Sequence, residues 1–252
     1  MTVEPVLLAA VALVGFAVGF VKSAVGLGGG AVSVPLLAAV LDPRVALGIT
    51  APIMLVTDLT TLRAHWRRWH WPTVRVLVPA ALIGVGMGAL FVATASAPGL
   101  RRAMGVVALA FAAVQARRLL GTPGGAAVNR VARKGTSRVL ASALGIGGGV
   151  VSILAHSGGL VFAFYLLPRL SRAAFVASLA MLLLVLDLAK IPLLVSAGAL
   201  TLRDLALGLA ATPVMMAGSR LGERVNGRLS ERTFLSLVTT VVFATGLWLL
   251  VR

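Results

Sequence analysis

The sequence has no cysteine and only 7 acidic residues among its 252. Without thiols, the chain can form neither a disulfide-stapled secreted scaffold nor a thiolate metal site, and it has no thiol nucleophile. Charged residues make up 12% of the chain and apolar residues 59%, whereas a soluble domain has about a quarter charged and under half apolar. A mean hydropathy of +1.02 also excludes a disordered chain.

The 23 Lys and Arg residues give a net charge of +16, which is typical either of a nucleic-acid-binding protein or of a membrane protein with basic loops. These residues cluster between apolar stretches, mainly at positions 63–75, 117–138 and 220–232. A spanning helix needs about 20 apolar residues. We therefore predict an all-α polytopic membrane protein whose partner is the lipid bilayer and not nucleic acid. Its apolar stretches are residues 5–41, 45–62, 76–93, 103–116, 139–168, 173–195, 205–219 and 233–251.

Two of these stretches are too long for one crossing. Residues 5–41 would extend about 55 Å as a helix, against a hydrocarbon core of about 30 Å. Glycines at 26–30 interrupt this stretch, and the stretch 139–168 is interrupted at 145–149 and again at 156–159. Because glycine disfavours the helix interior, each stretch is predicted to fold back as a helical hairpin, either re-entrant or paired.

The positions of the basic residues support this fold-back. If both long stretches crossed once, the loop charges would divide almost evenly between the two sides of the membrane. If both fold back, most of the charges fall on one side, as cytoplasmic loops require. This topology predicts a plasma-membrane protein with a cytoplasmic central linker and both termini in the periplasm. The first four residues carry no positive charge, so no removable signal peptide is expected.

The same features recur along the chain at a constant offset. Ser23, Gly28 and Asp58 in the first half correspond to Ser152, Ser157 and Asp187 in the second. We therefore predict two inverted repeats, each a glycine-broken hairpin followed by three transmembrane helices. The repeats cover residues 1–120 and 138–252, with a Gly- and Pro-containing linker at 121–137. Inverted repeats with broken helices are typical of secondary transporters, whose substrate lies near the repeat interface.

Several motifs, taken in order, resemble one family. They are Gly26-Leu-Gly-Gly-Gly-Ala-Val-Ser-Val-Pro35, Ser152-Ile-Leu-Ala-His-Ser-Gly-Gly159, Tyr165-Leu-Leu-Pro168, Asp187-Leu-Ala-Lys-Ile-Pro192 and Gly218-Ser-Arg-Leu-Gly222. Over nearly its whole length the chain resembles the TauE/SafE sulfite exporter family, also called the toluene sulfonate uptake permease family. The resemblance implies transport of small sulfur-containing anions, such as sulfite, sulfonates or thiosulfate, across the bacterial inner membrane. Many relatives have prolines where this chain has Leu160 and Val161, and asparagine at the position of Asp187.

The hairpin glycines are the first candidates for an anion site. Backbone N–H groups at a helix N-terminus carry partial positive charge, and glycine lets an anion approach them closely. The alternative is that glycines allow tight helix packing, which is the interpretation preferred for residues 84–88. The predicted substrate-binding residues are Lys22, Ser23, Gly28, Gly29, Gly30, Ser33, Ser152, His156, Ser157, Gly158, Gly159 and Lys190.

The buried charges and the histidines leave alternatives open. Lys22 either attracts the anion or snorkels to the interface, and His156 either binds the anion, relays protons or is structural. Lys190 lies three residues after Asp187, which favours a neutral intramembrane pair. Asp58 and Asp187 are the predicted proton-coupling residues, with Asp58 either protonated or paired across helices, for example with Lys22. His65 and His70 fall in a basic, tryptophan-rich segment interpreted as an interfacial belt, with no metal or cofactor expected.

The leading hypothesis is a secondary transporter of small anions that works by proton-coupled alternating access, as a monomer or a homo-oligomer. An anion channel would use similar chemistry. An intramembrane hydrolase using Ser152 or Ser157 with His156 is a third alternative. The serine recurs in the first half without a histidine, which favours a repeated binding element over a catalytic triad, and so the chain is not expected to be an enzyme.

Overall fold

The computed structural model describes residues 5–25, 29–120, 138–226 and 231–251, and all regular structure in these ranges is α-helical. Six segments are long and apolar enough to span a membrane: α3, α4, α5, α7, α9 and the pair α10–α11. The all-helical, polytopic architecture predicted from the sequence is therefore confirmed. The helices are α1 (Pro5–Val25), α2 (Gly29–Val40), α3 (Pro43–Ala64), α4 (Trp71–Thr94), α5 (Ala97–Leu119), α7 (Arg138–Ala155), α8 (Gly158–Leu166), α9 (Arg172–Ser196), α10 (Leu202–Ala210), α11 (Thr212–Asn226) and α12 (Glu231–Val251).

The element order repeats along the chain. A packed pair, α1 with α2, precedes α3, α4 and α5, and a second pair, α7 with α8, precedes α9, α10–α11 and α12. Short turns with a capping side chain start the third helix of each series. Asp42 accepts a hydrogen bond from the Arg44 N–H at 2.8 Å before α3, and Ser171 accepts one from the Ala174 N–H at 3.4 Å before α9. These caps fix where the two helices that carry Asp58 and Asp187 begin.

The predicted break at residues 145–149 is wrong. α7 runs without interruption from Arg138 to Ala155, and the second hairpin turns only at His156 and Ser157. Two of these glycines, Gly145 and Gly149, face α4, whereas Gly148 faces Phe162 of α8. A Cβ on Gly145 or Gly149 would collide with Leu77, Ala80, Ala81 or Val85. Close backbone packing along α4 therefore offsets the helix-weakening effect of these residues.

Glycines allow close backbone packing along two long helix contacts, α4 with α7 and α1 with α11. Gly84 and Gly88 of α4 lie against Ile146, Val150 and Ile153 of α7, opposite the glycines of that helix. α1 packs on α11 through Gly19, Gly218 and Gly222, whose added Cβ atoms would collide with the backbone of the other helix, and a Cβ on Gly15 would lie 3.2 Å from the Cβ of Ala211, just before α11. The packing interpretation of residues 84–88 is thus confirmed for Gly84 and Gly88, whereas nothing lies near a Cβ on Gly86.

Gly149 and Gly147 offer a matched test of this packing. A Cβ on Gly149 would overlap the Ala81 carbonyl oxygen, whereas a Cβ on Gly147 meets nothing within 4 Å. Gly149→Ala is expected to destabilise the protein by about 1–3 kcal/mol through overpacking. Gly147→Ala is expected to be neutral or stabilising by up to about 1 kcal/mol, because alanine favours helix. Thermal unfolding of the two variants in detergent measures the difference, and equal midpoints would contradict the packing argument.

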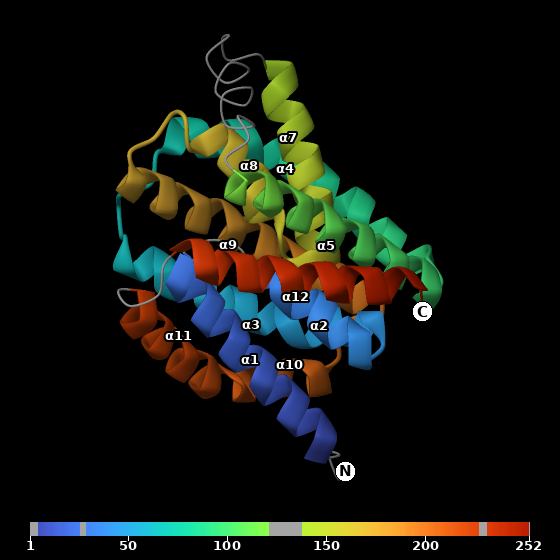
Figure 1. The fold of residues 1–252 in the computed structure, drawn as a ribbon. Helices are drawn as coiled ribbons and strands as arrows, with labels where there is room; N and C mark the ends of the chain where they lie inside the picture. Colours follow the sequence, from blue (N-terminus) through green and yellow to red (C-terminus); the bar gives the residue numbers. More distant parts are fainter. Residues whose placement is uncertain (1–4, 26–28, 121–137, 227–230, 252) are drawn as a thin grey trace.

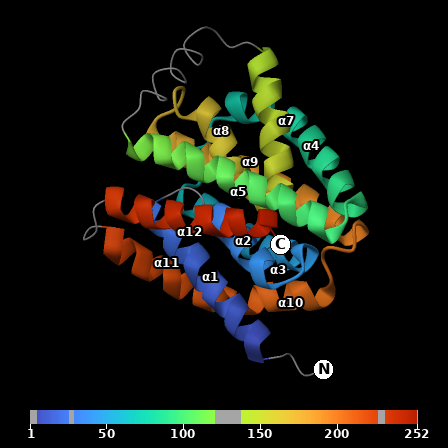
Figure 2. The same ribbon diagram turned by 45° about the vertical axis from the view of Figure 1, so that its right-hand side comes forward.

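The helices assemble into two bundles that each combine both halves of the sequence (Figures 1 and 2). One bundle contains α1, α2, α3, α10 and α11, and the other contains α4, α7, α8 and α9. The bundles meet where α3 contacts α9, and α5 packs on α12 between them. The hairpin arm of each half, α1 or α7, therefore packs against a helix of the other half. The opposite membrane orientation of the halves remains a prediction, and the linker 121–137 lies outside the described residues.

Candidate functional site

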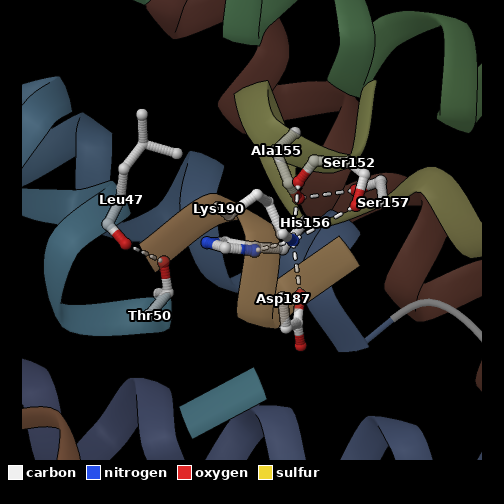
Figure 3. Close-up of polar contacts among 8 residues, drawn as sticks. All are labelled: Leu47, Thr50, Ser152, Ala155, His156, Ser157, Asp187 and Lys190. Carbon is white, nitrogen blue, oxygen red and sulfur yellow. Dashed lines mark hydrogen bonds and ion pairs between the residues drawn. The ribbon is translucent and has the colours of Figure 1, made fainter. Parts of the chain in front are cut away.

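The turn of the second hairpin places a histidine in an uncommon backbone conformation. His156 has a φ of 47°, a left-handed value that costs a residue other than glycine about 1–3 kcal/mol. Its N–H donates to the Ser152 carbonyl at 3.0 Å, so the last turn of α7 closes around it. The turn therefore directs the His156 side chain away from α8, as Figure 3 shows.

α8 begins without a side-chain cap. Ser157 occupies the N-cap position, but its hydroxyl donates to the Ala155 carbonyl at 2.7 Å instead of accepting from the helix. Among the described residues, no hydrogen bond engages the backbone N–H groups of Gly158 and Gly159. These two donors, with the partial positive charge of the helix N-terminus, suit an anion or ordered water.

Lys190 ties the hairpin turn to α9 (Figure 3). Its ammonium Nζ lies 2.5 Å from Asp187 Oδ1 and 3.0 Å from His156 Nδ1, and it is 3.2 Å from both the Oγ and the carbonyl oxygen of Ser152. The side chain is only 2% exposed. The ion pair expected from the three-residue spacing is thus present, and the three N–H bonds of the ammonium are all directed at protein acceptors.

A second buried acid lies across the contact between the bundles. Asp58 of α3 and Asp187 of α9 are 4% and 5% exposed, and their carboxyl groups interact directly. Spacing along one helix could not identify this partner, because it comes from the other half of the chain. The alternative partner, Lys22, lies on α1, but its side chain is outside the described part of the structure.

Two polar atoms of this cluster are buried without a hydrogen-bond partner among the described residues. They are His156 Nε2, which faces the backbone of Leu47 on α3, and Asp187 Oδ2. A buried polar atom without a partner costs about 1–3 kcal/mol. Such atoms mark positions where a ligand, water or proton acts. Leu47 was not a candidate from the sequence, because only its backbone takes part and no side-chain signal could identify it.

The first hairpin contributes the remaining candidates. Lys22 and Ser23 lie in the last turns of α1, and Gly29 and Gly30 in the first turn of α2, whereas Gly28 lies outside the described residues. Ser33 is fully buried on α2. The structure thus groups Ser152, His156, Asp187, Lys190 and Asp58 in one described cluster, while the side chains of residues 22–31 are not part of that description.

Leu160 joins α8 to an apolar cluster outside the site. It lies in the first turn of α8 and packs against a cluster to which α1, α2, α5 and α12 contribute, including Val21, Val32, Phe111 and Val242. The N-terminal turn of α8 therefore borders an apolar region that is shared by helices of both halves of the chain.

His65 and His70, between α3 and α4, contact threonines near the ends of these helices. The His70 ring nitrogen Nδ1 lies 2.7 Å from Thr73 Oγ1, and the His65 Nδ1 lies 3.2 Å from the Thr61 carbonyl. Three neighbouring tryptophans, Trp66, Trp69 and Trp71, pack edge to face with centroid separations of 5.3 and 6.4 Å. This arrangement resembles an aromatic belt at one end of α3 and α4.

Comparison with known proteins is consistent with this architecture. The model of the family described as sulfite exporter TauE/SafE matches residues 11–249, nearly the whole chain. No curated protein and no solved structure shows significant similarity. Membership of a transporter family also supports the interpretation that the chain is not an enzyme. The chain is a multi-pass membrane protein and belongs to the sulfite exporter TauE/SafE family.

Proposed function

We propose that this protein is a secondary transporter that moves small sulfur-containing anions, such as sulfite, sulfonates or thiosulfate, across the bacterial inner membrane. Membership of the family supports the substrate class. The observation that carries the proposal is the uncapped N-terminus of α8, where the Gly158 and Gly159 N–H groups have no protein partner among the described residues. In a mainly apolar protein these donors supply positive potential without a buried charge that needs neutralising.

The anion site is proposed to include both hairpins. The charge of Lys190 is offset by Asp187, so the attraction for an anion comes mainly from the helix N-termini. α2 begins with Gly29 and Gly30 as α8 begins with Gly158 and Gly159, and Leu160 of α8 packs against the apolar cluster to which α1 and α2 contribute. An anion held between these two N-termini would be partly shielded from lipid and would approach the backbone where no side chain intervenes.

Alternating access is proposed to involve movement of the two bundles against one another. Each bundle contains a hairpin, and the bundles meet through α3 with α9 and α5 with α12. The glycine-lined contacts α1–α11 and α4–α7 lie within the bundles, so each bundle would move as a rigid unit. In this proposal the halves have opposite orientations, both termini are periplasmic and the basic loops are cytoplasmic.

Proton coupling is proposed to use the Asp58–Asp187 pair, which lies at the contact between the bundles. Two negative charges this close in a buried site repel one another, so a single proton on the pair stabilises it. Asp187 is also held in an ion pair with Lys190, so substitution of Asp58 tests the coupling while this ion pair stays in place. Movement of the bundles would change the separation of the two carboxyl groups and with it their affinity for the proton.

Counterflow in proteoliposomes distinguishes the transporter from an anion channel. A transporter that alternates between two states exchanges labelled sulfite faster when unlabelled sulfite is present on the opposite side, and its flux saturates. Flux that neither saturates nor responds to anion on the opposite side would reject the alternating-access proposal and favour a channel.

Gly159 allows a direct test of the α8 donors. Gly159→Pro removes one backbone N–H in the first helical turn, where proline is tolerated. A hydrogen bond to a charged group is worth about 1.5–3 kcal/mol, so sulfite affinity is expected to fall by about 10- to 100-fold. Binding to purified protein is measured by isothermal calorimetry.

Gly159→Ala is the matched control, because it keeps the N–H and its Cβ would sit 3.4 Å from Leu183, an ordinary contact. Its affinity should stay close to that of the original protein. Gly158 is less suitable, since a Cβ there would collide with Gly148 and Ser152 and disturb the packing of α8 on α7. Equal loss of affinity in the Pro and Ala variants would contradict binding to this N–H.

A further inference from the structure

The contacts of Lys190 fix the protonation of the neighbouring histidine ring. A lysine ammonium has three N–H donors and no acceptor, so any hydrogen bond between Lys190 Nζ and His156 Nδ1 must be donated by the lysine. The ion pair with Asp187 keeps Lys190 in its charged form. Nδ1 must therefore present a lone pair. A neutral imidazole carries its one proton on the other nitrogen, so the proton of His156 lies on Nε2.

The protonated nitrogen has only one acceptor near it among the described residues. His156 Nε2 is buried and points toward the backbone carbonyl of Leu47 on α3, which already accepts from the Thr50 hydroxyl at 3.2 Å and leaves Nε2 without a well-formed hydrogen bond. The left-handed backbone at His156 directs the ring toward Leu47 of α3 and away from Ser157. The result is a neutral donor N–H held where the hairpin of one bundle faces α3 of the other.

We propose that Lys190 is a positioning residue that locks His156 in the Nε2–H tautomer, and that this N–H, which points away from the α8 N-terminus, donates a hydrogen bond to an oxygen of the transported anion where the anion passes the contact between the bundles. This inference rests on the proposed function, because the acceptor is the substrate. It also narrows the substrate class: the anion must bring an acceptor oxygen, as sulfite and sulfonates do, to a donor that adds no charge to the site. Lys190 then acts on the substrate through His156 and does not bind it directly.

The other side chains of the cluster support the role of Lys190 as a positioning residue and of His156 as the donor. The hydroxyl and carbonyl of Ser152 accept from Lys190 on the side opposite α3, and so they hold the lysine against the hairpin turn. Asp187 neutralises the ammonium and belongs to the same helix. Lys190 is the charged group described at Nδ1, and Asp187 is bound to that lysine, so Nε2 has no competing charged partner among the described side chains.

Nitrogen-15 NMR of histidine tests the tautomer directly, without substrate. The chain has three histidines, and a His65→Gln/His70→Gln background leaves only His156 labelled. The expected spectrum has a protonated Nε2 and an unprotonated Nδ1. Lys190→Arg should keep this tautomer, because arginine also only donates, whereas Lys190→Met should give a mixture of tautomers. An Nδ1–H tautomer or an imidazolium in the unsubstituted Lys190 protein would overturn the inference.

Addition of sulfite or methanesulfonate then tests the donor. The Nε2 proton resonance should shift with anion concentration, and His156→Asn should weaken binding by at least about tenfold, since asparagine tolerates left-handed backbone but lacks this N–H. Saturable binding that leaves the Nε2 proton unmoved would overturn the inference while leaving the proposed transport intact. Absence of any anion binding would reject the proposed function, and with it the donor role, while the tautomer result would stand separately.

Discussion

Lys190→Met is expected to lower the free energy of unfolding by about 3–5 kcal/mol. Removing one partner of a buried ion pair leaves the other charge without compensation, and this costs more than the pair itself contributed. Here the remaining Asp187 carboxylate would lose the ammonium described beside it and would still face the second acid, Asp58. The same substitution releases His156 and Ser152, so the hairpin turn loses its link to α9.

Thermal unfolding followed by tryptophan fluorescence in detergent measures this loss. The double variant Lys190→Met/Asp187→Asn is the control, because it removes both charges and leaves no isolated carboxylate at position 187. It should recover a large part of the lost stability, although His156 and Ser152 remain without Lys190. A single variant as stable as the original protein, or a double variant as unstable as the single one, would refute the assigned role of the ion pair.

The sequence predicted those features of the site that depend on local spacing. Asp187 and Lys190 are three residues apart, so their pairing on one face of α9 followed from helix geometry alone. The fold-back of residues 139–168 followed from a span too long for one crossing combined with glycine clusters, but of the two predicted breaks only the one at 156–159 is a turn. Length and hydropathy, together with the order of the basic loops, were sufficient to predict a helical membrane protein with repeated elements.

The glycines of α7 show where local spacing fails. A dense group of glycines weakens a helix when considered alone, and residues 145–149 therefore looked like a break. Whether the helix survives depends on a partner, α4, whose Ala81 and Val85 backbones accept only a glycine beside them. α4 is distant from α7 in the sequence. The glycine spacing at 84–88 of α4 predicts close helix packing, but it does not indicate which helix packs there.

The contacts across helices could not be inferred either. Lys190 and His156 are 34 residues apart, and their meeting depends on the left-handed turn after α7, which places a histidine in a conformation usually found at glycine. The interaction of Asp58 with Asp187 joins helices from different halves of the chain. The sequence showed that Asp58 needed a partner, because an isolated charge in a membrane is costly, but it could not show which residue would be that partner.

Asp58→Asn is expected to abolish the dependence of sulfite flux on a pH gradient. Asparagine is neutral at every pH and exchanges no proton, so a pH difference across the membrane can no longer drive accumulation. Asp187 would keep its ion pair with Lys190, and the mutual repulsion of two carboxylates would be removed. Exchange of sulfite for sulfite should therefore persist, because it moves anion in both directions and requires no net proton transfer.

Proteoliposomes loaded at two internal pH values separate these two activities. The matched control is Asp204→Asn, which replaces another buried acid in a different setting: Asp204 caps α10 through Thr201, 2.7 Å from its hydroxyl. An asparagine there can still accept this hydrogen bond, so the pH dependence should be unchanged and the cost limited to at most about 2 kcal/mol of stability. An Asp58→Asn protein that still accumulates sulfite in response to a pH gradient would place the coupling proton elsewhere. The joint loss of exchange and gradient response, in a protein that remains folded, would instead assign Asp58 to the substrate pathway.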